Sequence, residues 1–410
     1  MNQNQCRSCH SEKLVDIIDF GNQPWCNDFL TKENIGKERF YPLDLVCCKD
    51  CELLQLSYTV PKEVMFYNHQ YLSGVTSTLG KHFMQIAKEN KEHFDLKEDD
   101  LIVDIGGNDG FQLMQYKDIG LTNVVNVESA KNICAFSERK GIKTINAFFN
   151  EDTAKEHFNE GETKIINASG VFFHLEELHS VIRGIKYMLA DDGVFTIQFM
   201  YAGAMVENNN FDTVYHEHLC YYTLKNVITL LNPYGLEVFD AYYSDIHSGS
   251  IIAKVTHKDG LRDSKTESFM ETKKRDEKYS LEEYQRFFEG VKGYKENLYN
   301  FLSDLKSKGN TIYAYGAPAK GNTLLNYCGI TNDIIDKVVE INKLKLGFYM
   351  PQSHIPIVLE DKEDLPDYYL LLSHNFASEI IKKNKDIIEK GVKFIIPFPE
   401  IEVRALEDEG

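Results

Sequence analysis

Short apolar runs alternate with amphipathic helical patterns over most of the chain from about residue 73 onward. In the first part, apolar runs predict strands at 101–105, 124–128, 142–146, 164–168, 194–199 and 251–255, preceded by a helix over 79–94. Strands that alternate with helices in this way favour a parallel sheet covered by helices on both faces. The expected fold class is therefore α/β.

The alternation stops between residues 259 and 308, where the chain is heavily charged with helical spacing and contains no proline. This region predicts one or two long helices, most clearly over 279–304. The pattern then resumes, with strands at 311–315, 337–341, 368–372 and 393–397 and helices at 322–327 and 377–390. We expect a second, smaller Rossmann-like domain over 309–410, which a helical connector over 259–308 joins to the first.

The first 72 residues differ from the rest, because they hold six of the nine cysteines and few long helical patterns. Cys6 and Cys9 form one Cys-x-x-Cys pair, and Cys48 and Cys51 form another. Two such pairs are the usual ligands of a tetrahedral zinc ion, and four sulfur ligands leave no open position for substrate. We expect a zinc-binding module over 1–72 with a structural zinc ion, followed by the larger sheet domain over 73–258.

Composition narrows the classes of function. A length of 410 residues exceeds one ordinary core and predicts two or three domains. A formal net charge of −18 argues against a nucleic-acid surface, which needs a basic patch. No apolar run approaches the roughly 20 residues of a membrane span, and the N-terminus lacks the apolar segment of a signal peptide. We expect a cytoplasmic protein, and a reducing compartment favours metal ligation by the paired cysteines over disulfides.

A glycine-rich turn follows the first strand of the larger predicted sheet, at 106–110. The glycines let the backbone approach a ligand, but their spacing does not fit the dinucleotide fingerprint, and the acidic Asp104 precedes them. Glu128 ends the next strand about 20 residues later, where a carboxylate can accept both hydroxyls of a ribose. Together these residues resemble the class I S-adenosylmethionine-dependent methyltransferases. The predicted methyl-donor site comprises Asp104, Gly106, Asn108, Gly110, Glu128, Phe148, Phe149 and Asn167, although core packing explains the two phenylalanines equally well.

One segment places four titratable side chains together: Tyr215, His216, Glu217 and His218. Such a cluster is typical of proton-transfer chemistry, because burying these groups for packing alone costs desolvation energy. An exposed polar loop is the alternative. If the segment is extended, Tyr215 and Glu217 face one side and the two histidines face the other.

Longer strings make the whole chain similar to the nucleotide-sugar C-methyltransferases that act on keto-deoxysugars. The strings are the two cysteine pairs, 68–71 with Ser73, 104–110, 211–218 and 315–323. The resemblance implies a class I methyltransferase core between the zinc-binding module and a C-terminal Rossmann-like domain that helps to bind the sugar nucleotide. It also implies S-adenosylmethionine and zinc as cofactors, and it places Tyr71 and His174 in the pocket.

Methylation of a carbon beside a ketone needs a base that removes a proton and donors that stabilise the resulting enolate. We expect His218 to be the base, Glu217 to tune an imidazole, and Tyr215 to donate to the sugar oxygen or relay the proton. His216 is an alternative base, and it could bind a second metal with His218, although no third ligand is assured. His174 could equally be an ordinary histidine at a helix terminus.

The turn after the first strand of the C-terminal domain carries Gly316 and Lys320 just before a helix. Free backbone N–H groups, the helix dipole and the Lys320 charge would together hold an anion, which in an acidic protein suits a pyrophosphate. Alternatively, the turn only buttresses the catalytic core. The predicted substrate site comprises Tyr315, Gly316, Lys320, Asn322, Glu340 and His247.

The sequence therefore predicts an S-adenosylmethionine-dependent C-methyltransferase that acts on a nucleotide-linked keto-deoxysugar, for a branched sugar of a surface polysaccharide or a secondary metabolite. O- or N-methylation of a related sugar is one alternative, because it needs a base but no ketone. A catalytically silent sugar-nucleotide-binding protein is another. The nucleotide, the methylated carbon and the oligomeric state do not follow from the sequence.

Overall fold

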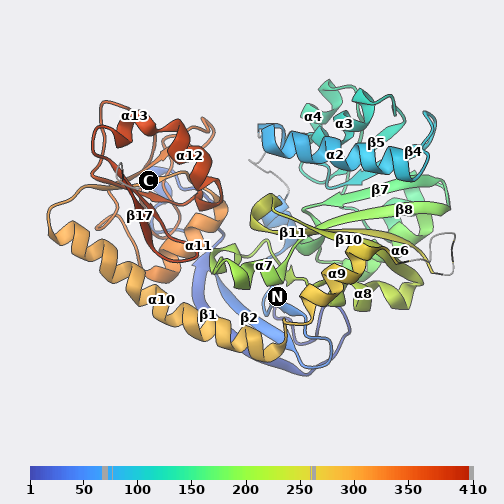
Figure 1. Ribbon diagram of the computed structural model, residues 1–410, viewed down its shortest axis with the longest axis horizontal. Coiled ribbons are helices and arrows are strands. Elements are labelled where there is room, and N and C mark those ends of the chain that lie inside the picture. The colour runs from blue at the N-terminus through green and yellow to red at the C-terminus, as the bar shows by residue number, and fades with distance from the viewer. Residues whose placement is uncertain (67–72, 76, 259, 261–264, 406–410) are drawn as a thin grey trace.

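The structure is a computed structural model that describes residues 1–66, 73–75, 77–258, 260 and 265–405. Its strands form three sheets, which occupy three regions of Figure 1. The sheet with β1 and β2 lies at the bottom of the view, the sheet with β7 and β8 at the right, and the sheet with β17 at the left. Tyr71, one of the predicted pocket residues, lies outside the described residues.

The first sheet is antiparallel and has the strand order β1-β2-β3-β9. The sequence pattern did not predict its strands β1 (Leu14–Pro24), β2 (Phe40–Cys48) and β3 (Leu54–Leu56), which the short helix α1 (Lys62–Phe66) follows. The fourth strand, β9 (Cys220–Tyr221), comes from the segment directly after the predicted catalytic cluster. A strand from the middle of the chain therefore completes the sheet of the N-terminal region.

The second sheet has the order β10-β11-β8-β7-β4-β5-β6. The prediction of a parallel sheet is correct for the strands from β8 to β6, but β11 is antiparallel to β8. The reason is the short connection between β10 and β11, because a few residues can join only antiparallel neighbours. The strands are β4 (Leu101–Ile105), β5 (Val124–Glu128), β6 (Lys143–Asn146), β7 (Thr163–Ser169), β8 (Leu189–Met200), β10 (Leu236–Ser244) and β11 (Ser250–His257).

Helices cover both faces of the second sheet, because successive side chains of a strand point to opposite faces. Ile102 packs in a core with Leu113 of α3, whereas the next residue, Val103, belongs to the larger core that includes Ile182 of α6. The helices are α2 (Ser77–His93), α3 (Phe111–Asp118), α4 (Lys131–Arg139), α5 (Glu151–His157), α6 (Leu178–Met188), α7 (Ala202–Glu207) and α8 (Leu224–Leu231).

Two helices occupy the charged region that was expected to connect the domains. They are α9 (Glu267–Asp276) and α10 (Leu281–Ser307). Ser280 caps α10, since its hydroxyl accepts the backbone N–H of Glu283. In Figure 1, α10 runs along the lower left edge of the molecule, from beside β2 to the left-hand sheet.

The third sheet has the order β14-β13-β12-β15-β16-β17 and is parallel except for β17. The helix predicted at 377–390 is two helices that meet at Asn384, whose buried side chain donates to Tyr315 Oη at 3.2 Å and to the Ile380 carbonyl at 2.9 Å. The elements are β12 (Ile312–Tyr315), α11 (Ala319–Cys328), β13 (Lys337–Glu340), β14 (Ile357–Leu359), β15 (Tyr368–Leu371), α12 (Ala377–Lys383), α13 (Lys385–Ile388), β16 (Lys393–Ile396) and β17 (Glu402–Arg404).

None of the helices in the described part of the chain is both long and apolar enough to cross a membrane.

Candidate active site

A cavity of about 190 Å³ lies where β4, β5, β6 and β7 end. Gly106 forms part of its wall in a left-handed conformation, with φ +66°, and an added Cβ would lie 2.6 Å from Val171. A side chain at this position would therefore be strained and would fill the space beside the turn. Of the residues predicted to bind the methyl donor, the cavity is lined by Gly106, Asn108, Glu128, Phe148 and Phe149.

Glu128 is fixed by backbone hydrogen bonds at the mouth of the glycine-rich turn. Its Oε2 accepts the N–H of Asn108 at 2.9 Å, and its Oε1 accepts the N–H of Ala130 at 2.7 Å. These bonds orient a nearly buried carboxylate toward the cavity. Such a carboxylate is suited to accept the hydroxyls of a ribose.

The other three predicted donor residues lie behind the cavity wall. Asp104 is buried, and burial and the nearby Glu128 raise its pKa well above the usual value. Gly110 begins α3 with φ +73°, and an added Cβ would lie 2.5 Å from Ile142. Asn167 is fully buried and accepts a 3.2 Å hydrogen bond from Tyr116. These residues shape the turn and the sheet beneath it, so the prediction that they line the site differs from the structure.

Glu217 and His174 line the same cavity as the donor-site residues. His174 lies in a short 3-10 helix (Phe172–His174) before α6, and its Nδ1 donates to the Glu217 carbonyl at 2.5 Å. The ring centres of His174 and His218 are 5.1 Å apart, and the ring centres of Tyr215 and His218 are 3.8 Å apart. The structure therefore brings Tyr215, Glu217, His218 and His174 together, and two of them, Glu217 and His174, line the cavity.

The segment that carries these side chains is a turn, so the expectation of alternating faces is wrong. The N–H of His218 donates to the carbonyl of Tyr215 at 2.9 Å, which places the two rings against each other. His216 instead packs edge-on against Tyr41, and its Nε2 donates to the Tyr41 carbonyl at 3.4 Å. His216 is therefore a packing residue between the turn and the first sheet.

Burial controls the protonation of the turn. His218 donates from Nδ1 to the Thr213 carbonyl at 2.7 Å, and burial followed by the nearby His174 lowers its pKa well below the usual value. Its ring is therefore neutral near pH 7, and the lone pair is on Nε2. Burial and the Glu217 charge raise the pKa of Tyr215 well above the usual value, so its hydroxyl keeps its proton.

The sequence reasoning missed two residues that bind Glu217 and a lysine that lines the cavity. The indole Nε1 of Trp25 and the side-chain Nδ2 of Asn27 both donate to Glu217 Oε1, each at 2.6 Å. Lys62 lines the cavity, with its ammonium 4.8 Å from the Phe148 ring centre and 2.6 Å from Glu177. The only sequence signal for Trp25 was that it is the single tryptophan of the chain.

The predicted phosphate turn has a defined backbone conformation. Gly316 adopts φ +83°, and an added Cβ would lie 2.3 Å from the Ser373 hydroxyl. Glu340 accepts the N–H of Ala317 at 2.8 Å, and its other oxygen accepts two backbone N–H groups at its own strand end. Glu340 thus fixes the turn in the way that Glu128 fixes the donor turn.

Two residues of the predicted substrate site point elsewhere. Tyr315 packs in the core beneath α12 and α13, where its hydroxyl donates to Glu360 at 3.0 Å. Asn322 is buried and donates to the carbonyl of Cys26 at 2.6 Å, and the next residue, Thr323, donates to the carbonyl of Val214 at 2.7 Å. This part of the string buttresses the catalytic turn, as the alternative interpretation proposed.

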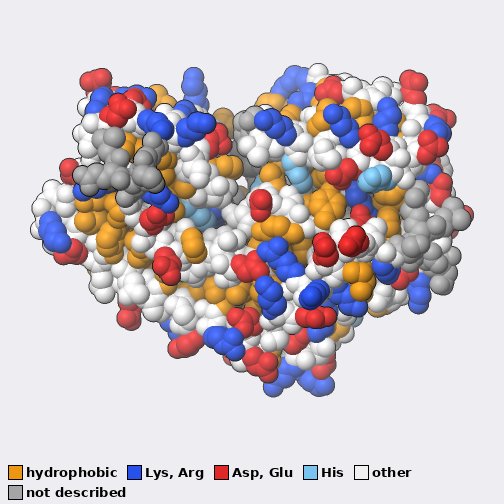
Figure 2. All heavy atoms as spheres, in the orientation of Figure 1, with side chains coloured by type: hydrophobic (Ala, Val, Ile, Leu, Met, Phe, Trp, Pro, Cys, Tyr) orange, Lys and Arg blue, Asp and Glu red, His pale blue; other side chains and the backbone are white. Residues whose placement is uncertain are grey.

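Lys320 lies in the first turn of α11, His247 lies in the connection between β10 and β11, and the Lys320 charge is one of the causes that lower the pKa of His247. Burial lowers the pKa of Lys320, whereas Asp212 opposes this change. His247 is exposed in this connection, and the atoms around its ring, followed by His82 and Lys320, lower its pKa. Figure 2 shows the surface hollowed between the left and right lobes that carry the third and second sheets.

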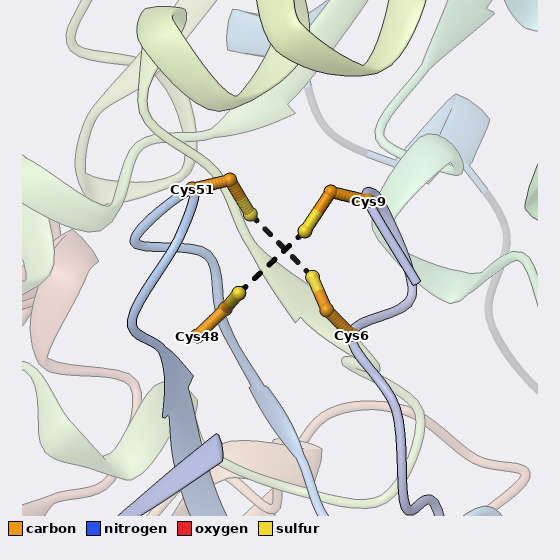
Figure 3. A group of neighbouring side chains, drawn as sticks. All are labelled: Cys6, Cys9, Cys48 and Cys51. Carbon is orange, nitrogen blue, oxygen red and sulfur yellow. Dashed lines mark hydrogen bonds between the residues drawn. The ribbon is translucent and has the colours of Figure 1, made fainter. Parts of the chain in front are cut away.

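The four paired cysteines form one cluster. Figure 3 shows the thiols of Cys6, Cys9, Cys48 and Cys51 pointing toward one another, and all four sulfur atoms lie within 4.8 Å of each other. The Cys6 and Cys51 sulfurs are 3.5 Å apart, close to the roughly 3.8 Å expected for tetrahedral zinc with Zn–S bonds of about 2.3 Å. The side chains thus fit a zinc ion. Within the described residues no other such cluster occurs, and the proposed pairing of His216 with His218 as metal ligands has no geometric support.

The cavity also fits a methyl donor with an adenosyl group. It combines a close glycine turn, a fixed carboxylate and two phenylalanines, and the buried Ser169 hydroxyl on its wall finds no partner among the described residues. A Rossmann-like sheet with this site after its first two strands defines a class I S-adenosylmethionine-dependent methyltransferase.

Comparison with known proteins narrows the class. Three family models match in succession: "Putative zinc binding domain" at residues 6–66, "Methyltransferase domain" at 80–241 and "C-methyltransferase C-terminal domain" at 245–399. The chain is 31% identical over 412 residues to C-methyltransferase NovU of Streptomyces niveus, covering 98% of this chain and 97% of that protein. The chain therefore belongs to the C-methyltransferase family, with S-adenosylmethionine and zinc as cofactors.

Solved structures align with only part of the chain. The alignment with an S-adenosylmethionine-dependent methyltransferase from Clostridium acetobutylicum covers 43% of this chain and 92% of that protein, with a TM-score of 0.36 and 13% sequence identity. The alignment with the Burkholderia thailandensis 1,6-didemethyltoxoflavin-N1-methyltransferase covers 51% of this chain and 97% of that protein, with a TM-score of 0.34 and 13% sequence identity. Family membership therefore follows from the full-length match.

Proposed function

We propose that this C-methyltransferase methylates a carbon atom of a nucleotide-linked keto-deoxysugar through an enolate. The observation that carries this proposal is the position of Glu217 and His174, which line the end of a cavity otherwise made of donor-site residues. Proton-transfer groups thus stand beside the place of the methyl donor. A carbon next to a ketone needs this arrangement, because it becomes a nucleophile only after it loses a proton.

S-adenosylmethionine supplies an electrophilic methyl group when it is bound. In our proposal His218 takes the proton from the sugar carbon, since its neutral ring has an accepting Nε2. The Glu217 carboxylate favours the protonated ring, as it raises the pKa of His218 against the effect of burial. Tyr215, whose hydroxyl remains protonated, donates to the enolate oxygen.

The hollow between the lobes is the proposed place of the sugar nucleotide. Lys320 and the turn at Gly316 supply the positive charge and backbone N–H groups that suit a pyrophosphate, and His247 faces them from the other lobe. We further propose four functional units: a zinc-binding module over 1–72, a methyltransferase core over 73–258, a helical connector over 259–308 and a nucleotide-binding domain over 309–410.

The test uses a nucleotide-linked 4-keto-6-deoxyglucose, offered with a thymidine, uridine, cytidine or guanosine diphosphate group. With S-adenosylmethionine, mass spectrometry should show one added methyl group, and its 13C NMR shift should be that of a methyl bonded to carbon rather than to oxygen or nitrogen. In heavy water with S-adenosylhomocysteine in place of the methyl donor, the accepted substrate should exchange a C–H for deuterium. Methyl transfer without exchange, or a product whose new methyl is bonded to oxygen or nitrogen, would favour O- or N-methylation. Nucleotide binding without either reaction would favour a silent binding protein.

A further inference from the structure

The three residues Trp25, Cys26 and Asn27 connect the catalytic turn to helix α11 of the C-terminal region. The side chains of the outer two both donate to Glu217 Oε1, at 2.6 Å each. The carbonyl of the middle residue accepts the side-chain amide of Asn322 at 2.6 Å. One short segment of the N-terminal region is therefore held by α11 on one side and holds Glu217 on the other.

A second contact joins the same two regions. The Lys345 ammonium lies 4.8 Å from the centre of the Phe29 ring and donates to the Ala317 carbonyl at 2.7 Å. Ala317 belongs to the turn that precedes Lys320, so Lys345 connects Phe29 to the proposed nucleotide turn. Two independent contacts thus tie residues 25–29 to the C-terminal region.

Two donors on one oxygen give a carboxylate a defined direction. A hydrogen bond to a charged group contributes more than one between neutral groups, and its loss typically corresponds to about a ten- to hundredfold change in an equilibrium or rate. Both donors are half-buried, so water competes weakly for them. Because the effect of Glu217 on His218 depends on the position of its charge, these donors affect proton transfer without touching the substrate.

We propose that Trp25 and Asn27 are positioning residues for Glu217, and that Asn322 holds them in place through Cys26. This inference rests on the proposed function of Glu217. It gives the N-terminal region a part in catalysis besides zinc binding, and it links Glu217 mechanically to the helix that begins at the proposed nucleotide turn.

The single tryptophan permits a test that needs no substrate. In the 15N-labelled full-length protein, one indole N–H resonance should appear, shifted downfield by the short bond to a carboxylate. Glu217→Gln and Asn322→Ala should both move it upfield. Asn326→Ala is the matched control, because it removes an amide from the same helix that has no hydrogen-bond partner among the described residues. A resonance that Asn322→Ala leaves in place would overturn the link through Cys26.

Kinetics test the positioning itself. Trp25→Phe keeps the ring and removes the donor, and Asn27→Ala removes the other donor. Each should lower kcat about tenfold or more while KM and S-adenosylhomocysteine affinity stay within about twofold. The double variant should lose less than the product of the two single effects, since both donors act on one oxygen. Wild-type kcat in both single variants would overturn the proposal.

The two readouts separate the inference from the proposed function. If Glu217→Gln keeps full turnover, the catalytic role of Glu217 fails, and the positioning role fails with it, whatever the indole resonance does. If Glu217→Gln is inactive but Trp25→Phe and Asn27→Ala are normal, only the positioning role fails. Retained zinc and an unchanged melting temperature would confirm that the variants are folded.

Discussion

Glu128 and Glu340 hold the same position in two different sheets. Each ends the strand beside the first parallel strand, and each accepts a backbone N–H of the turn after that first strand, from Asn108 at 2.9 Å and from Ala317 at 2.8 Å. Both turns contain a glycine with positive φ whose Cβ would collide with a neighbouring side chain. The chain therefore contains two turns of one design, the first beside the cavity that fits the methyl donor and the second at the proposed nucleotide site.

Substituting the two glutamates should separate the two ligands. Glu128→Ala should weaken S-adenosylhomocysteine binding by about ten- to a hundredfold, because it removes the carboxylate that faces the ribose position and frees the Asn108 turn. Glu340→Ala should leave that affinity unchanged and weaken binding of the nucleoside diphosphate of the substrate. Isothermal titration calorimetry of both variants with both ligands measures this. Equal losses of S-adenosylhomocysteine affinity would contradict the assignment.

Removing zinc should impair catalysis even though zinc lies outside the cavity. β9 follows the catalytic turn and pairs with β3, and Asn226 of α8 donates to the carbonyl of the ligand Cys51 at 2.8 Å. Loosening the cysteine cluster therefore loosens the turn that carries Glu217 and His218. Metal analysis should find about one zinc per chain, and Cys48→Ser should lose both zinc and most of kcat. Cys328→Ser, at a buried cysteine outside the cluster, is the control and should retain both.

The donor turn and the two Rossmann-like sheets could be predicted because they depend on local patterns. The bounds predicted for β4 and β5 agree with the structure, since an apolar run between polar turns determines a buried strand. The antiparallel β11 and the strand β9 could not be predicted in this way. Their pairing depends on contacts between distant segments, such as β3 with β9, that no periodicity encodes.

The candidate site was predicted in part, for a similar reason. The cluster at 215–218 pointed to a segment that lies beside the cavity, but treating it as extended assigned the wrong neighbours to His216, because the turn bond from His218 to Tyr215 is not visible in the sequence. Asn322 was assigned to substrate although it binds Cys26, nearly 300 residues away in the chain. Trp25 and Asn27 were missed since their role exists only in the folded chain.

Lys320 should contribute to substrate binding more than to chemistry. Lys320 lies in the first turn of α11, where it adds a positive charge beside the backbone donors of the proposed nucleotide turn. Lys320→Ala should raise KM for the sugar nucleotide about tenfold or more, with a smaller change in kcat and none in S-adenosylhomocysteine affinity. Lys320→Arg should recover part of the affinity because it restores the charge. A large loss of kcat at unchanged KM would instead place Lys320 near the reacting atoms.

Acid should destabilise the protein through His216. Burial lowers the pKa of His216 to about 4, whereas in the unfolded chain it is near 6.5. Below pH 6.5 the unfolded chain binds the proton first, so the free energy of unfolding decreases as the pH falls from 6.5 to about 4. Between pH 7.5 and 5.5 the loss from this residue is about 1 kcal/mol. Urea unfolding followed by Trp25 fluorescence measures it. In the His216→Asn variant the free energy of unfolding should fall by about that much less than in the wild type over this pH range. In the His93→Asn variant, which changes an exposed histidine, it should fall as much as in the wild type.

Proton abstraction should depend on His218 and on Glu217 in different ways. His218→Ala removes the proposed acceptor, so deuterium exchange into the keto sugar and methyl transfer should both fall at least a hundredfold, while S-adenosylhomocysteine still binds. Glu217→Gln keeps the acceptor but removes the charge that favours its protonated form, so exchange should slow by a smaller factor. His174 gives a further test of His218 and Glu217, because its charge lowers the pKa of His218 and its Nδ1 donates to the Glu217 carbonyl. His174→Gln keeps a donor for that backbone and should therefore retain more exchange than His174→Ala. If His218→Ala exchanges at the wild-type rate and Glu217→Gln does not, the carboxylate itself is the base.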